Sequence, residues 1–155
     1  MTCSIYEKND LICLSFSDRA AAFPSKSNDA DIGYRNGKPF VRHTKSFHKR
    51  IAYIKTQYRL ACQVAHINIH YDEQKLFAFC LLGSKTRIHD SHNFPKTFCD
   101  FAEDMGIISN DRLMTCWAIH KKDCDIIGKD ITTTDIFLCL QPQIIMQNFF
   151  QELIK

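Results

Sequence analysis

Acidic, imidazole and amine side chains gather between residues 90 and 111. Asp90 and His92 alternate in a polar link, so in an extended backbone their side chains point the same way. Asp111 precedes the next apolar stretch and is expected to face them across the start of a helix. Two carboxylates and a third ligand around an open position can hold a divalent cation. Lys96, one turn into that helix, is placed to support a phosphate or a leaving oxygen.

Each of these residues also has an ordinary structural explanation. Asp90 or Ser91 can cap a helix, an effect of about 1 kcal/mol. Lys96 and Asp100 are four residues apart and can form a weak ion pair on a helix surface. Asp111 can be a turn residue. Taken singly, these explanations are the more common ones, and only the joint spacing favours a metal site.

A strongly basic segment precedes this cluster. Residues 32 to 71 carry eight lysine or arginine side chains and no carboxylate, whereas the net charge of the whole chain is only +3. A field of one sign repels itself unless a polyanion neutralises it, and phosphate backbones are the usual polyanion. The predicted DNA-contacting residues are Arg35, Lys38, Arg42, Lys45, Lys49, Arg50, Lys55, Arg59 and Arg87, with Tyr34, Phe40 and Phe47 interleaved as possible contacts to sugars or bases. A solvated basic helix without a partner, and acidic protein or lipid partners, are the alternatives.

The pattern between residues 90 and 111 resembles the RusA family of Holliday junction resolvases. That family carries Asp-x-Asp-Asn-x-x-Lys at the opening of a helix, an Asp on the helix, a Gly at its end and an Asp-Asp pair before the next strand. This chain has Asp90, Asn93, Lys96, Asp100, Gly106 and Asp111 at matching spacings without a gap. The upstream FPSKSN is similar to the family's Pro-Pro-Ser-Asn loop, and the resemblance covers roughly residues 10 to 140.

The resemblance implies a homodimer that binds four-way DNA junctions and nicks them in pairs, in DNA recombination and repair. It implies Mg²⁺ as the cofactor, Asp90 as the first metal ligand, Asp111 as the third and Lys96 as the supporting cation. His92 stands at the second aspartate position, and Asn110 replaces the first residue of the Asp-Asp pair.

The histidine at position 92 changes the expected metal chemistry. Mg²⁺ prefers oxygen ligands, whereas imidazole suits Mn²⁺, Zn²⁺ or Fe²⁺ better. Three outcomes are therefore open: the site uses Mn²⁺, it recruits Asp100 or Asp104 as another carboxylate, or the protein binds DNA without cutting it. A general nucleic-acid-binding protein that keeps only the fold is a further alternative.

Apolar periodicity predicts the scaffold that holds these residues. Helices are expected at Ser46 to about Ile67, at about Phe94 to Met105 and at Gln143 to Ile154; strands are expected at Leu11–Phe16 and Lys75–Gly83, and at Arg112–Lys121 and Thr132–Leu140, which a turn near Gly128 joins. Residues 22 to 40 are expected to be loop-like, with a tight turn at Asn36-Gly37. This order predicts an α/β (α+β) fold, a small mixed sheet covered by two main helices, and the resemblance makes it RusA-like. The chain is expected to be a single domain, 1 to 155, with a core at about 10 to 140 and a C-terminal helical extension at 141 to 155.

Composition limits the class of protein. A length of 155 residues with 45% hydrophobic residues fits one domain with its own core. The chain has no apolar run of membrane-spanning length and its first residues do not read as a secretory signal, so a cytoplasmic protein without membrane contact is predicted. The eight cysteines form no CxxC pair and lie mostly in apolar runs, which predicts buried reduced thiols.

Overall fold

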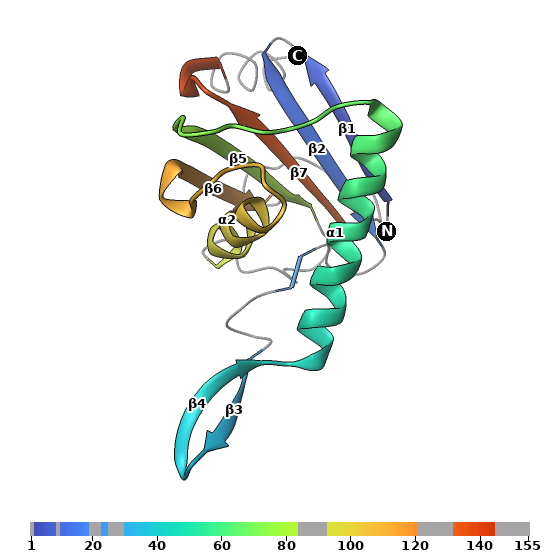
Figure 1. Cartoon of the computed structure of the whole chain (residues 1–155). Helices are drawn as coiled ribbons and strands as arrows, with labels where there is room; N and C mark the ends of the chain where they lie inside the picture. The colour runs from blue at the N-terminus through green and yellow to red at the C-terminus, as the bar shows by residue number, and fades with distance from the viewer. Residues whose placement is uncertain are drawn as a thin grey trace.

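A mixed sheet with helices packed on one face, and a hairpin that stands apart from it, make up the fold of the computed structural model (Figure 1). The structure describes residues 2–8, 10–18, 23–24, 30–83, 93–120 and 132–144. Its elements are β1 (Thr2–Lys8), β2 (Leu11–Asp18), β3 (Ala30–Arg35), β4 (Lys38–His43), α1 (Lys45–Ala65), β5 (Leu76–Gly83), α2 (Phe94–Asp104), the 3₁₀ helix η1 (Asp111–Leu113), β6 (Met114–His120) and β7 (Thr132–Cys139).

The main sheet has the strand order β1-β2-β7-β5-β6. β5 and β6 pair in parallel, with α2 between them in the chain, while the other neighbours pair antiparallel. α1 lies against β1 and α2 lies against β6 on the same face of the sheet, because both helices contribute to one buried cluster (Figure 1). The expected α+β class, with a mixed sheet covered by two main helices, is confirmed.

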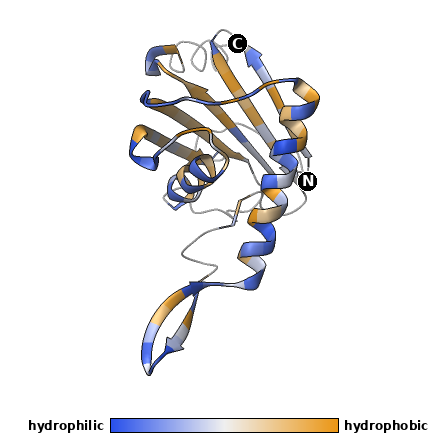
Figure 2. Cartoon of the chain, in the orientation of Figure 1, coloured by the Kyte–Doolittle hydropathy of each residue, from blue (hydrophilic) through white to orange (hydrophobic). Residues whose placement is uncertain are grey.

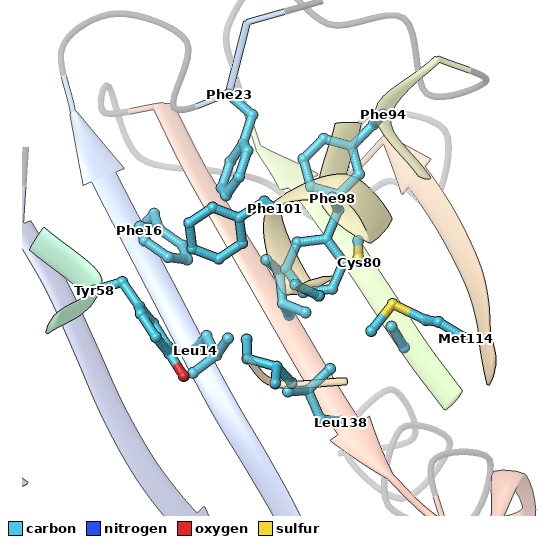
Figure 3. Packing of buried hydrophobic residues seen from close by; sticks show 14 of the residues in the cluster. Leu14, Phe16, Phe23, Tyr58, Cys80, Phe94, Phe98, Phe101, Met114 and Leu138 are labelled. Atoms are coloured by element: carbon cyan, nitrogen blue, oxygen red, sulfur yellow. The ribbon is translucent and has the colours of Figure 1, made fainter. Parts of the chain in front are cut away.

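Aromatic side chains fill the space between the helices and the sheet. The inner face of α2 contributes Phe94, Phe98 and Phe101, and all three are buried. Phe101 meets Phe16 of β2 and Tyr58 of α1 edge-on, at ring-centroid distances of 6.3 and 5.6 Å (Figure 3). Since these rings hold α2 by its inner side, the outer side of α2 is left to carry polar residues.

Three expectations about the strands need correction. β1 was not expected, although Cys3 and Ile5 alternate with exposed residues and pack on the core. The loop expected up to residue 40 is wrong from residue 30 onward, where β3 and β4 form a two-stranded sheet of their own. β6 and β7 are separated by β5, so they are not the neighbouring pair that a simple turn would produce.

Two further expectations concern membrane contact and the C-terminal part of the chain. Within the part of the chain that the structure describes, no helix combines the length and apolar character needed to cross a membrane. The turn at Gly128 and most of the expected helix from Gln143 to Ile154 fall outside the described residues.

Candidate nucleic-acid interface and metal centre

The hairpin of β3 and β4, residues 30 to 43, projects from the body of the molecule and is called the arm here (Figure 1). Its strands pair from Ala30↔His43 to Arg35↔Lys38 around the two residues Asn36 and Gly37. Both turn residues have positive φ, 52° and 74°, the conformation in which a two-residue turn matches the twist of its strands. The tight turn predicted at Asn36-Gly37 is thus confirmed, and it closes a hairpin where a loop was expected.

The arm leads directly into α1. Thr44 is the N-cap, and its hydroxyl oxygen accepts a hydrogen bond from the Phe47 backbone N–H at 3.1 Å. The His43 ring stacks on the ring of Phe47, with 4.4 Å between centroids and 23° between planes. Phe47 itself is buried, so the suggestion that it contacts sugars or bases is wrong. Cap and stack together fix the base of the arm to a helix that the core holds.

Basic side chains cover the arm and the outer side of α1. Lys45, Lys49 and Arg59 are exposed on the side of α1 opposite its buried residues. On the arm, Arg35 and Lys38 flank the turn and are exposed. Residues 30 to 65 contain eight basic side chains against the single carboxylate of Asp31, so this surface carries a strong positive charge.

Among the predicted DNA-contacting residues whose ion pairs the structure describes, Arg42 and Lys55 have carboxylate partners. Arg42 meets Asp31 across the arm, with 3.1 Å between guanidinium and carboxylate. Lys55 donates to the carboxylate of Asp104 at 2.7 Å and so links α1 to α2. Both pairs are on the surface, where such an interaction contributes roughly 0–1 kcal/mol and is readily exchanged for another anion. Arg50 is half-buried, and Arg87 lies outside the described residues.

α2 begins and ends as the sequence predicts. Pro95 stands in its first turn, and Gly106, with φ of 71°, follows its end. Lys96 is exposed on the outer side of α2, away from the phenylalanines. Asp90 and His92 fall outside the described residues, so their distance from Asp111 is not part of this structure.

Asp111 opens the short helix η1 directly before β6. Asn110 is its N-cap and accepts a hydrogen bond from the Arg112 N–H at 3.0 Å, a role that the aspartate of the family pattern would fill equally well. The side chain of Asp111 is exposed. Its charge acts on Cys99 of α2, the residue three positions after Lys96. The carboxylate therefore lies beside α2, at the start of β6, while its expected position opposite Asp90 and His92 stays a prediction.

Asp100 and Asp104, the two carboxylates of α2 that could replace a metal ligand, have different surroundings. Asp104 is engaged with Lys55, as described above, whereas Asp100 is half-buried and has interactions within the fold. Among the residues that the structure describes, no group of three or more histidine, cysteine, aspartate or glutamate side chains is placed to hold a metal ion.

A thiol cluster lies near Asp111 and consists of Cys99 of α2, Cys80 of β5 and Cys116 of β6. The sulfur atoms of Cys80 and Cys116 are 3.7 Å apart, and Cys99 hydrogen-bonds to Cys116. The bond to Cys116, burial and the charge of Asp111 all raise the pKa of Cys99. Such thiols are unreactive at neutral pH. The seven cysteines in the described ranges are all free, but only three of them are buried and four are half-buried, so the prediction of buried thiols holds in part.

A histidine that the sequence did not single out ties the segment after α1 to the end of α2. The Nδ1 atom of His70 lies 2.6 Å from the carbonyl oxygen of Gly106, and Nε2 lies 2.6 Å from a carboxylate oxygen of Asp72. Next to it, the Tyr71 N–H donates to the carbonyl of Ile107 at 2.7 Å. These contacts hold the chain that runs from α2 to Asp111. This role is visible only from the contacts of His70 with Gly106 and Asp72, since an exposed histidine in a loop carries no sequence signal.

The contribution of the His70 contacts to the stability of the protein is expected to depend on pH. The bond to Gly106, followed by the bond to Asp72 and its charge, raises the pKa of His70 from its usual 6.5. Its contribution to stability is fully present below that value and is lost as the pH rises through the higher pKa of the folded state. We expect the melting-temperature difference between the wild type and His70→Gln to be largest below pH 6.5 and to shrink above it. His66→Asn, at the exposed end of α1, is the control; a His70 difference that stays constant from pH 5 to 9 contradicts the assignment.

A scan against protein-family models gives no match, and a search of curated proteins gives no significant match. The likeness to RusA-type resolvases therefore rests on the residue pattern of this chain.

Proposed function

We propose that this protein binds branched DNA through the arm and α1 and cleaves it as a structure-selective endonuclease, in DNA recombination and repair. One observation carries the DNA-binding part: eight basic side chains stand against one carboxylate on the arm, which projects from the body, and on α1, which continues from it. Neutralising DNA phosphates with such side chains releases counterions, which makes binding favourable and strongly dependent on salt. The positive field also speeds the encounter with a polyanion.

The proposed reaction is metal-dependent hydrolysis of a phosphodiester bond near the start of α2. Asp111 fits a metal ligand because its carboxylate is exposed at the mouth of β6 beside α2. Asp90 and His92 complete the proposed donor set from the sequence pattern. When bound, a divalent ion supplies Lewis-acid activation of water for attack on phosphorus. Lys96 is exposed on the outer side of α2, and we assign it the stabilisation of negative charge on the phosphate.

Two carboxylates and one imidazole form a mixed donor set. The family resemblance implies Mg²⁺, but Mn²⁺ accepts nitrogen ligands more readily. We therefore propose Mg²⁺ or Mn²⁺ as the cofactor, with higher activity in Mn²⁺.

His92 also favours a second candidate function, a RusA-like protein that binds junctions but is catalytically impaired. A neutral imidazole in place of a carboxylate removes one negative charge from the proposed site. In this alternative the basic surface keeps its role and only the chemistry is lost.

The assembly and location are proposed on the same basis. We propose a homodimer, as the family resemblance implies, because paired nicks across a junction need two sites. We propose the cytoplasm as the place of action, and the free cysteines of the described segments suit a reducing compartment.

The decisive experiment measures binding and cleavage of a synthetic four-way junction. We expect the junction to bind at least about tenfold more tightly than linear duplex of the same length at equal salt, with nicks in Mn²⁺. Equal affinity for the junction, linear duplex and RNA would instead indicate a general nucleic-acid-binding protein. No binding to any of them removes the proposal.

A single substitution separates the two candidate functions. His92→Asp restores the carboxylate of the family pattern. If the wild type cleaves in either metal between pH 7 and 9, the impaired alternative is wrong. If the wild type binds without cleaving and His92→Asp gains cleavage in Mg²⁺, the impaired alternative is correct.

A further inference from the structure

The two faces of the arm differ sharply in chemistry. Directly opposed residues of an antiparallel pair project to the same side. The register therefore puts Ile32 with Val41 and Tyr34 with Pro39 on one side, called the apolar face. The other side, called the basic face, carries the pairs Asp31–Arg42, Gly33–Phe40 and Arg35–Lys38.

The basic face supplies interactions that hold the hairpin together. The ring of Phe40 lies over Gly33, so a Cβ atom at position 33 would come within 2.8 Å of it. Beside this contact, the Asp31–Arg42 ion pair joins the two strands. Phe40 packs on its own hairpin through one edge of its ring, and 45% of its surface stays exposed. The arm therefore keeps its shape through one face.

The apolar face is uncovered. Ile32, Tyr34 and Val41 expose 61%, 73% and 74% of their surface, although each belongs to a strand. The arm stands away from the sheet and the helices, and hydrophobic residues are visible along it (Figure 2). Contiguous apolar surface at such a position is typical of an interaction site rather than of a solvated loop.

A second copy of this chain and a nucleic acid are the two candidate partners for the apolar face, and the charge of the arm favours the nucleic acid. A second copy of this chain would bring two arms of like charge together, because each arm carries Arg35, Lys38 and Arg42 against the single carboxylate of Asp31, and the two positive fields repel each other. A polyanion is attracted by both these residues and by Lys45 and Lys49 at the start of α1. A nucleic acid also offers apolar surface, since the faces of its bases stack on aromatic and aliphatic side chains.

The chemistry of the apolar face selects which part of DNA it meets. Ile32, Pro39 and Val41 have no side-chain hydrogen-bonding group, so in a groove their contact with base edges is limited to thymine methyl groups. Base faces offer them a larger apolar surface, which a continuous duplex hides in its stack and exposes only at the cost of unstacking. A branch point interrupts the stack and exposes these faces.

We propose that the apolar face of the arm packs against unstacked bases at a DNA branch point, while Arg35, Lys38 and the start of α1 hold the adjoining phosphates. This inference rests on the proposed DNA binding and adds to it the element that recognises the branch. Tyr34 is the central contact, because it is the aromatic residue of this face and lies beside the turn. Preference for a junction over linear duplex then comes from the arm, while general affinity comes from the cations.

The test compares Tyr34→Ala with Tyr34→Phe on a four-way junction and on linear duplex. Loss of one base–aromatic stack costs about 1–3 kcal/mol, so we expect the junction Kd to rise about fivefold or more in Tyr34→Ala. Tyr34→Phe keeps the ring and is expected to bind like the wild type. The duplex Kd, and the slope of affinity against salt on both DNAs, should stay unchanged in Tyr34→Ala because no phosphate contact is removed.

Three further variants make the result specific. Lys38→Gln is expected to weaken binding to both DNAs and to reduce the salt slope by about one. Val41→Thr keeps a β-branched strand residue but adds a hydroxyl, so it should weaken junction binding without unfolding the arm. Tyr6→Ala, at an exposed tyrosine on β1 of the main sheet, should change neither Kd.

The outcomes separate the inference from the function on which it rests. If the wild type binds no DNA, the proposed function fails and the inference falls with it. If the wild type prefers the junction and Tyr34→Ala keeps that preference, the inference alone is wrong. It is also wrong if Tyr34→Ala weakens junction and duplex equally, or if sedimentation shows that Tyr34→Ala turns a dimer into a monomer.

Discussion

Asp111→Asn is expected to abolish cleavage of a four-way junction while leaving its binding intact. The substitution keeps the size of the side chain but removes the charge that we propose holds the metal ion. Loss of a residue that merely orients a metal ligand lowers activity about 10- to 100-fold, so loss of a ligand itself should exceed about 100-fold. Because Asp111 is exposed, the fold should tolerate the change. The measurement is the single-turnover cleavage rate in Mn²⁺, with the junction Kd measured in parallel without metal.

The matched control is Asp104→Asn. Asp104 is the last residue of α2 and is exposed like Asp111, but it forms an ion pair with Lys55. We expect Asp104→Asn to retain the cleavage rate, which also tests whether Asp104 has been recruited as a replacement ligand. Equal loss in both variants would point to a general effect of charge, and full activity of Asp111→Asn would exclude Asp111 as a ligand. If the wild type only binds DNA, the same comparison is made on Mn²⁺ affinity by electron paramagnetic resonance.

The sequence predicted the elements that have one clear apolar face. α1 follows this rule, since Ile54, Tyr58 and Ala61 repeat at helical spacing and are all buried. β5 follows it as a continuous apolar run whose residues are half-buried or buried. The cap at Thr44 and the stop at Gly106 depend on local chemistry, which a single sequence displays directly.

The missed elements are those whose apolar alternation is short or is not directed at the core. β3 and β4 expose most of their side chains on both faces, so their alternation has no buried partner to reveal it. β1 is an edge strand, and its short alternation is easily mistaken for a polar terminus. The insertion of β7 between β2 and β5 is a long-range choice that no local pattern encodes.

In the candidate site, too, local sequence signals predicted some positions, whereas contacts between distant segments were missed. The elements that carry Lys96 and Asp111 were predicted correctly because a helix start, a helix end and a strand start locate them, while their roles in a site stay predictions. The positions of Asp90 and His92 stay predictions from spacing. His70 and the thiol cluster of Cys80, Cys99 and Cys116 were not foreseen as contacts, since segments distant in the sequence bring them together.

Phe101→Ala is expected to lower the free energy of unfolding more than any other substitution proposed for this protein. The ring is 1% exposed and packs against four aromatic neighbours: Phe16, Phe23, Tyr58 and Phe98 (Figure 3). Removing a fully buried phenylalanine costs about 3–5 kcal/mol, because the transfer energy is lost and a cavity is left. Domains of this kind have a free energy of unfolding of about 5–15 kcal/mol, so the variant should lose a large part of its stability.

Urea unfolding followed by the fluorescence of Trp117, the single tryptophan, measures this loss. The control is Tyr53→Ala on the exposed side of α1, which should change stability by about 0.5 kcal/mol or less. Because Phe101 joins α2 to β2 and α1, its loss should also loosen the helix that carries Lys96. We therefore expect Phe101→Ala to lower cleavage at temperatures well below its own melting point, while the junction Kd, set by the arm and α1, changes little. A loss below about 1 kcal/mol would show that α2 is not held by this cluster.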